Sequence, residues 1–306
     1  MKKIPALLLL AFLCIQAQAQ NTRWSVTRQK NYSQSHPIGT ETLQLRNSFG
    51  KMELKTWDKN EVKVDAVITV SAMEDDYALK LLEAIKIVDN KAADAISFKT
   101  QIGDEDRGWN GNQSSEMHID YTVYFPAHAR LDARNMFGNM LIGDYSGEGE
   151  LVSMHGSFTG GKLSNLKKIT VQFGKANIQS LSNTDILFQH SVIDIAEING
   201  DLKGQINFCN GVDLLLGSQA KSIDLKSQHS SLYFFLEKNK NLEYDINTNN
   251  GIATGKGDIR LQEVNETTGN VRSIGYRPNH RYTGKLGSGN GSKLQVSTSF
   301  GNVRLL

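Results

Sequence analysis

Three histidines occupy the same position in a repeated pattern of this 306-residue chain, and histidine is a common metal ligand. They are His155, His190 and His229. If the repeats stack ~4.8 Å apart, as hydrogen-bonded strands do, successive histidines are two repeats apart, at about 9–10 Å. A zinc ion needs each ligand nitrogen at ~2.0–2.1 Å, so two of these histidines cannot share one. The spacing therefore predicts stacked histidines inside the fold and no metal site.

A second set of residues could bind a ligand. Three places after the small residue of each repeat, successive repeats carry Asn177, Asp194, Asp213 and Tyr233. Strand alternation points these side chains outward, with the backbones of Asp194 and Asp213 ~5 Å apart. That is close to the carboxylate separation of a retaining glycosidase, and acids beside an aromatic ring also suit a glycan. An outward face gives no burial to hold a carboxyl group protonated. We therefore expect a ligand-binding row or an ordinary solvated face, with no catalytic residue.

Two further features have chemical potential. The loop Asp104–Asn112 carries Asp104, Asp106 and Asn110, whose oxygens suit Ca²⁺, but its spacing does not match the EF-hand loop. We expect a solvated loop there. Cys209 has no neighbouring sequence sign of activation and is expected to be a buried thiol. Nucleophile-elbow, zinc-protease and phosphate-loop motifs are absent, so we expect neither an enzyme nor a cofactor.

A strand, a small residue and a second strand recur along the chain and must position these side chains. Apolar residues follow the small residue two and four places later, as Ile193 and Ile195 follow Ser191. The small residues, here called position zero, recur at intervals of 17 to 20 residues between Gly138 and Asn250. Such a period is typical of a solenoid, whose equivalent residues stack between coils. The proposed zero positions are Gly50, Gly138, Gly156, Gly174, Ser191, Asn210, Ser230, Asn250 and Gly301.

The residue before position zero is aromatic or Cys in most repeats. It falls in phase with the inward residues of the preceding strand, so we expect an internal ladder of Phe, His and Cys. Its members would be Phe49, Phe137, His155, Phe173, His190, Cys209, His229, Asn249 and Phe300.

The region before the regular repeats contains one helical pattern. Ser71 and Glu74 have capping-box spacing, and acidic residues follow in the first turn, where the helix dipole favours them. Tyr77, Leu81 and Ile85 then fall on one face. These signals predict a short amphipathic helix over residues 72–90, packed on the sheet. A partner-binding helix is the alternative.

The first residues are typical of an export signal. Lys2 and Lys3 precede an apolar run that is too short to span a bilayer, and Ala17-Gln18-Ala19 fits a cleavage site. Removing these two lysines from the 34 basic residues leaves 32, equal to the 32 acidic residues. This balance argues against a nucleic-acid partner. The polar, aperiodic residues 20–40 predict a flexible tether. No later stretch is long and apolar enough to cross a membrane.

Several stretches of this chain resemble a known family. They are residues 47–64, the capped helix, His118–Pro126, Asn135–Met140 and Gly289–Val303. Together they resemble the exported "putative adhesin" β-solenoid family of Gram-negative bacteria over about residues 41–306. The resemblance implies a β-solenoid and an adhesin-like function, with no established catalytic residue to carry over. The three histidines depart from the family's usual aromatic residue, which affects stacking only.

We therefore expect an all-β, mainly parallel β-helix or solenoid with coils of about 17–20 residues and one short helix. Its expected function is non-catalytic binding of a glycan or an envelope or surface protein. The alternatives are a carbohydrate-active enzyme using outward acids and a periplasmic structural or sensing protein. The expected location is the periplasm, the outer-membrane surface or the extracellular space. The expected organisation is a signal peptide (1–19), a tether (20–40), and a domain (41–306) divided into an N-terminal part (41–130) and regular coils (131–306) with an inserted hairpin at about 258–285.

Overall fold

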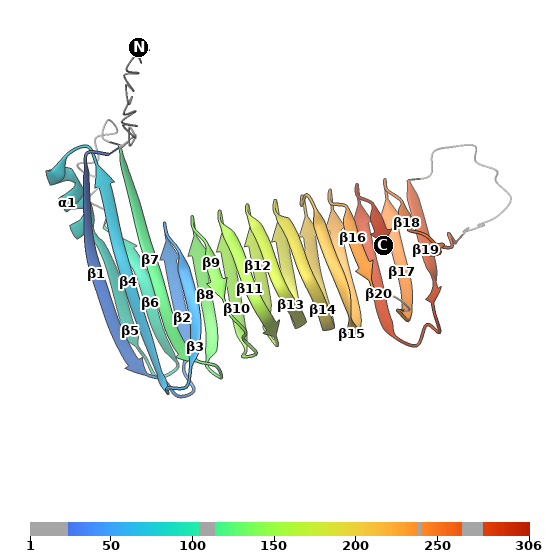
Figure 1. Cartoon of the computed structure of the whole chain (residues 1–306), viewed down its shortest axis with the longest axis horizontal. Helices are drawn as coiled ribbons and strands as arrows, with labels where there is room; N and C mark the ends of the chain where they lie inside the picture. Colours follow the sequence, from blue (N-terminus) through green and yellow to red (C-terminus); the bar gives the residue numbers. More distant parts are fainter. Residues whose placement is uncertain (1–23, 104–113, 238–239, 265–277) are drawn as a thin grey trace, which may run out of the picture.

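The structure, a computed structural model, describes residues 24–103, 114–237, 240–264 and 278–306. The expected signal peptide and the loop Asp104–Asn112 fall outside these residues. Within them, 21 strands form one mixed hydrogen-bonded sheet, and a single α-helix lies at one end. Figure 1 shows the strands side by side along an elongated molecule, with the helix at the N-terminal end. The described part of the chain is therefore all-β apart from this helix.

The middle of the chain repeats one pairing at every step. All pairings among its strands are parallel, and they join residues one sequence repeat apart, such as Leu151 with Ile169 and Asn177 with Asp194. The period in the sequence is thus the interval at which paired residues recur. These strands are β8 (Arg130–Met136), β9 (Met140–Ile142), β10 (Gly149–Met154), β11 (Ser157–Ser164), β12 (Lys168–Gln172), β13 (Lys175–Gln189), β14 (Val192–Asn207), β15 (Val212–Gln228) and β16 (Leu232–Leu236).

The N-terminal strands do not follow chain order. β2 pairs in parallel with both β6 and β8, and β3 pairs in parallel with both β7 and β9. β4 is antiparallel to β1 and β7, and β5 is antiparallel to β6, which makes the sheet mixed. The elements are β1 (Val26–Pro37), β2 (Thr42–Ser48), β3 (Met52–Trp57), β4 (Glu61–Ala72), α1 (Asp75–Ala84), β5 (Ile85–Lys91), β6 (Ala95–Ile102) and β7 (Ser115–Pro126).

The C-terminal strands are also inserted out of order. β20 lies between β15 and β17, and β21 lies between β16 and β18, all in parallel. β19 closes this end, antiparallel to β17. Of the expected hairpin at about 258–285, the described part contains an antiparallel bridge between Glu263 and Tyr282. The strands are β17 (Leu242–Asn249), β18 (Ala253–Gly255), β19 (Asn279–Leu286), β20 (Ser292–Ser299) and β21 (Val303–Leu305).

Two local predictions need correction. Val26–Pro37, expected within a flexible tether, forms β1 and pairs with β4 along its whole length. The helix expected over residues 72–90 spans only Asp75–Ala84, because Ile85–Lys91 forms β5 and pairs with β6. The capping box is not formed, since Ser71 belongs to β4 and Glu74 makes no side-chain cap. No described helix, the ten-residue α1 included, has the length and apolar character needed to cross a membrane.

Small residues at position zero let the backbones of successive repeats approach closely. A Cβ added at Gly156 would lie 2.0 Å from the carbonyl oxygen of Gly138, and one at Gly138 would lie 2.0 Å from that of Gly50. The alternating residues on each side of this turn, such as Ile193 and Ile195, are fully or almost fully buried in one continuous apolar core. The close contact between turns and the buried core together fix the positions of the strands that carry the outward side chains.

Candidate functional site

The four residues singled out in the sequence lie in one row across four neighbouring strands. Asn177 on β13 pairs with Asp194 on β14, which pairs with Asp213 on β15, which pairs with Tyr233 on β16. We call these four residues the polar row. The next position after Tyr233 is Arg304 on β21. The three polar side chains are exposed and Tyr233 is half-buried, so the row ends in an aromatic ring beside a cation.

The row offers hydrogen-bond acceptors that no other residue in the described part of the chain uses. Among the described residues, neither Asp194 nor Asp213 forms a side-chain hydrogen bond or an ion pair. Hydrogen-bonded strands set the two carboxylates ~5 Å apart at the backbone. Ionised carboxylates accept hydrogen bonds from hydroxyl and amide groups, and an aromatic ring provides an apolar surface for a sugar or an aliphatic side chain.

A stack of eight aromatic rings runs along the molecule at the turn before this row. The rings follow the strand order and lie at centroid distances of 4.8–5.1 Å, with interplanar angles of 3–14°. We call this set the ring stack: Phe49, Phe137, His155, Phe173, His190, Phe208, His229 and Phe300.

The prediction that this ladder is internal is wrong. The phenyl side chains of the stack are 37–53% exposed, and its three histidines are exposed as well. The reason is the backbone: every residue of the stack has φ between 49° and 62°, in the left-handed region. This turn sends the side chain out to solvent although alternation from the preceding strand would send it inward.

The membership of the ladder also differs from the prediction at two repeats. Phe208, not Cys209, stacks between His190 and His229, and Cys209 takes the small-residue position behind it. In the repeat formed by β17 and β18, Asn250 has φ 52°, and Gly251 packs against the carbonyl of Gly301. Asn250, not Asn249, is therefore the equivalent residue, and Gly251, not Asn250, is position zero. Because residues 249 and 250 are both Asn, the residue type could not separate them. The available signal was Gly251, since the strand before it fits the repeat with this glycine as position zero.

The histidines of the stack are kept apart by phenyl rings. Each of His155, His190 and His229 has a Phe on both faces, so no two histidines are neighbours. No group of three or more His, Cys, Asp or Glu residues placed to hold a metal ion occurs in the described part of the chain.

Cys209 is a buried free thiol, as its surroundings in the sequence indicate. Burial raises the pKa of the Cys209 thiol, against the opposing hydrogen bonds from the backbone. The thiol lies 3.4 Å from the carbonyl oxygen of Asn207. A raised pKa leaves little thiolate at neutral pH, so this thiol is a poor nucleophile.

The chain matches no protein-family model and no curated protein. Among solved structures it is similar to a "putative adhesin" from Bacteroides fragilis (12% identity, TM-score 0.41, 90% of this chain and 97% of that chain). It is also similar to a "putative lipid binding protein" from Parabacteroides distasonis (12% identity, TM-score 0.32, 90% and 96%). A third is a "putative cell adhesion protein" from Clostridium sporogenes (12% identity, TM-score 0.25, 91% and 99%). At these identities and TM-scores the similarities say nothing about what this chain binds.

Proposed function

We propose that this chain is an exported, non-catalytic, adhesin-like binding protein whose parallel repeats form a β-solenoid that presents a long outward face to glycan or protein ligands. The observation that carries the proposal is the polar row. Parallel pairing at one repeat per strand brings Asn177, Asp194, Asp213 and Tyr233 to consecutive positions on neighbouring strands. An extended ligand with a regular repeat would meet the same geometry at each step along such a face.

The ring stack adds apolar surface beside this row. Each ring precedes the row residue of its repeat by four or five residues, as Phe173 precedes Asn177 and Phe208 precedes Asp213. Because the rings lie face to face, only their edges remain available to a ligand. A polar row next to an apolar edge suits amphipathic ligands such as sugars, which have hydroxyl groups and apolar C–H faces.

The exposure of the carboxylates favours binding over hydrolysis. A retaining glycosidase needs one carboxyl group kept protonated by its surroundings while the other attacks. Asp194 and Asp213 are both open to solvent on a strand face. Water screens such groups, which suits reversible hydrogen bonding to a ligand.

Arrays of glycans and of purified surface and envelope proteins test the proposal. The wild-type mature chain is compared with the Asp194→Asn/Asp213→Asn double variant and with Tyr233→Ala. We expect a ligand whose affinity falls about tenfold or more in both variants, since charged hydrogen bonds and aromatic contacts contribute ~1–3 kcal/mol each. Asp185→Asn is the matched control, because Asp185 is exposed on another face of β13.

Two outcomes would overturn this assignment. One is the absence of any ligand that distinguishes the row variants from the Asp185→Asn control. The other is turnover of a polysaccharide that disappears in either single Asp→Asn variant, which would make the row a catalytic site.

A further inference from the structure

Phenylalanine and histidine alternate strictly along most of the ring stack. From Phe137 to Phe300 the stacked order is Phe, His, Phe, His, Phe, His and Phe. Only the N-terminal end departs from this order, where Phe49 stacks on Phe137. Histidines therefore recur at every second ring, at about twice the strand spacing of ~4.8 Å.

Stacking within the protein does not explain this alternation. Phe49 stacks on Phe137 at 5.1 Å and 11°, much as His155 does at 4.9 Å and 8°, so a phenyl ring fills such a place as well as an imidazole. The three imidazoles of the stack form no hydrogen bond or ion pair with another described residue; those recorded for histidine side chains belong to His36, His118 and His280. Because the imidazoles of the stack are exposed, their ring nitrogens are available to a ligand.

The stack and the polar row have complementary hydrogen-bonding character. The edge of an aromatic ring carries a partial positive charge, and each neutral imidazole adds one N–H donor. Asp194 and Asp213 supply acceptors in the row. The residue two places before each row residue lies on the same strand face, between the stack and the row. In the repeats of β14, β15 and β16 this residue is Val192, Gly211 or Ser231, so short side chains separate the donors from the acceptors.

An extended β-1,4-linked glycan has the same two periods as this surface. Each sugar advances such a chain by about one strand spacing, ~4.8 Å, and is turned over relative to the sugar before it. One sugar therefore corresponds to one repeat, and the same group faces the stack at every second sugar, as the histidines require. Sugar hydroxyl groups both donate and accept hydrogen bonds, so one chain can use the donors and the acceptors together. Glycans with α-1,4 or β-1,3 linkages curve and lose this match.

We infer that an extended β-1,4-linked glycan binds along the long axis of the molecule, between the ring stack and the polar row, with one sugar per repeat and an imidazole hydrogen bond at every second sugar. The inference rests on the proposed function and narrows it to one class of ligand. Stack and row run together over four repeats, in which Phe173, His190, Phe208 and His229 precede the four row residues.

Isothermal titration calorimetry of the mature chain with soluble oligosaccharides tests the site. Cellotetraose and chitotetraose, which are both β-1,4-linked, should bind at least about tenfold more tightly than cellobiose, because the longer chains reach all four repeats. Maltotetraose (α-1,4) and laminaritetraose (β-1,3) have the same number of sugars. They should bind at least about tenfold more weakly than cellotetraose, since they cannot meet successive repeats in the same way.

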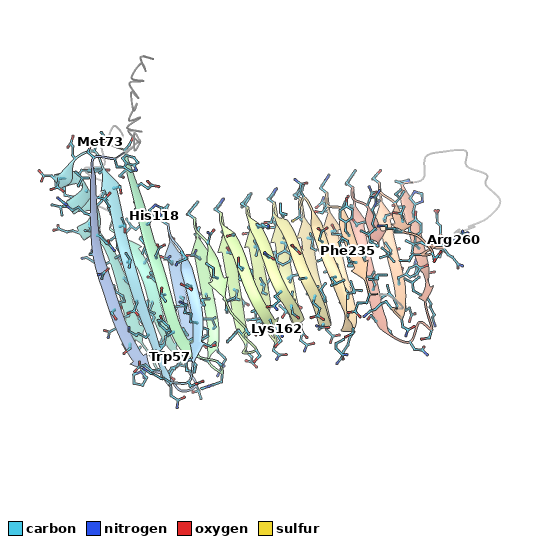
Figure 2. The ribbon with its side chains drawn as sticks, viewed as in Figure 1. Trp57, Met73, His118, Lys162, Phe235 and Arg260 are labelled. Atoms are coloured by element: carbon cyan, nitrogen blue, oxygen red, sulfur yellow. The ribbon has the colours of Figure 1, made fainter. Side chains whose placement is uncertain are left out.

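A double variant separates hydrogen bonding from stacking. His190→Phe/His229→Phe keeps aromatic rings in the stack and removes two imidazoles. We expect it to weaken binding of both β-1,4-linked tetraoses about tenfold, as for the loss of two hydrogen bonds, while thermal unfolding shows no loss of stability. His118→Phe is the matched control, because this exposed histidine lies on β7 outside the stack, as Figure 2 shows.

Three results would refute this inference: no binding of either β-1,4-linked tetraose at millimolar concentration, equal affinity for the three linkages, or the same affinity for cellotetraose in the double histidine variant as in His118→Phe. Failure of the proposed function is recognised separately. A ligand of another class that is lost in the Asp194→Asn/Asp213→Asn variant would leave the proposed function in place and exclude the glycan. If no ligand distinguishes the row variants from their control, the proposed function itself fails.

Discussion

At the scale of single residues, each member of the ring stack combines an unfavourable left-handed backbone conformation with favourable stacking against the neighbouring rings. A left-handed conformation costs a non-glycine residue ~1–2 kcal/mol. A stacked aromatic pair contributes ~0.5–1.5 kcal/mol beyond the area that it buries, and each internal ring of the stack has two such neighbours. Stacking therefore offsets the backbone cost, which explains how Phe and His persist where Gly or Asn would be the usual residue.

This balance predicts an inverted order of two substitutions at Phe173. Phe173→Ala removes both ring contacts and keeps the backbone cost, so we expect it to lower the free energy of unfolding by about 1–3 kcal/mol. Phe173→Gly loses the same contacts but relieves the left-handed backbone, and should be about 1 kcal/mol less destabilising than Phe173→Ala. Urea unfolding of both variants measures the difference.

Phe235 provides the control for this order. It is an exposed phenyl side chain within β16, without a left-handed backbone. Glycine in a strand interior costs more than alanine, so Phe235→Gly should be the less stable of its pair. If Phe173→Ala also has a larger free energy of unfolding than Phe173→Gly, the left-handed backbone does not strain the residues of the ring stack.

The sequence predicted the polar row because the row depends only on strand alternation and the repeat interval. Asp194 and Asp213 lie three and four residues after the small residues Ser191 and Cys209. They fall in the stretch of β14 and β15, Ile193–Ile195 with Val212–Leu214, where the register is regular. The ring stack depends on a backbone turn, and alternation cannot be extended through a residue with positive φ. This is why the equivalence of most ladder positions, Cys209 and Asn249 excepted, could be recognised while the outward direction of the rings could not.

At the scale of elements, the contact between successive turns depends on the absence of a side chain at position zero. Gly156→Ala would place a Cβ 2.0 Å from the carbonyl oxygen of Gly138, so the turns must separate and strain the strand pairs on both sides. We expect the free energy of unfolding to fall by about 3 kcal/mol or more. Gly143→Ala is the control, since nothing lies within 4 Å of its added Cβ.

Chemical denaturation measures both glycine variants. The Gly143 control should remain within about 0.5 kcal/mol of the wild-type chain. Equal stability of the two variants would mean that the turns adjust to a side chain without losing strand pairing.

The N-terminal elements were predicted less well because their signals compete. Ile85 fits the helical face of Tyr77 and Leu81, but Ile85 and Ile87 also alternate with exposed residues as in a strand. Pairing with β6 decides in favour of the strand, and this partner cannot be identified from a local pattern. β1 was missed for a similar reason: among the described strands it pairs only with β4, so its polar residues remain compatible with an edge strand.

At the scale of the whole molecule, the period predicts which residues are equivalent but not the spatial order of the repeats. The C-terminal repeat carries the same small residue and apolar spacing as its neighbours. The sequence pattern is therefore equally compatible with a position in the sheet beyond β18, in chain order. Instead β20 and β21 fill the place between β15–β16 and β17–β18. Figure 1 shows this end, where the chain finishes beside strands that precede it in sequence.

This order predicts that the last residues hold the C-terminal third together. In a chain ending at residue 291, β15 and β17 lose their shared neighbour, and core residues that contact β20 become exposed. Because repeats of this kind are stabilised mainly by their neighbours, the damage should remain local. Hydrogen exchange should show lost amide protection in β15–β18 and retained protection in β8–β12.

Point variants in β20 and β21 test whether the lost protection comes from removing buried side chains rather than from shortening the chain. Leu294→Asp puts a charge at a fully buried position of β20 and should reproduce the local loss, whereas Arg304→Ala changes an exposed residue of β21 and should not.

Uniform loss of protection through β8–β12 would mean that the molecule unfolds as one cooperative unit. Full protection of β17 in the truncated chain would mean that its pairing with β19 is sufficient. Local loss would establish that β20 and β21 join two otherwise separate parts of the sheet, and that β15–β18 cannot complete their pairing until residues 292–305 have been synthesised.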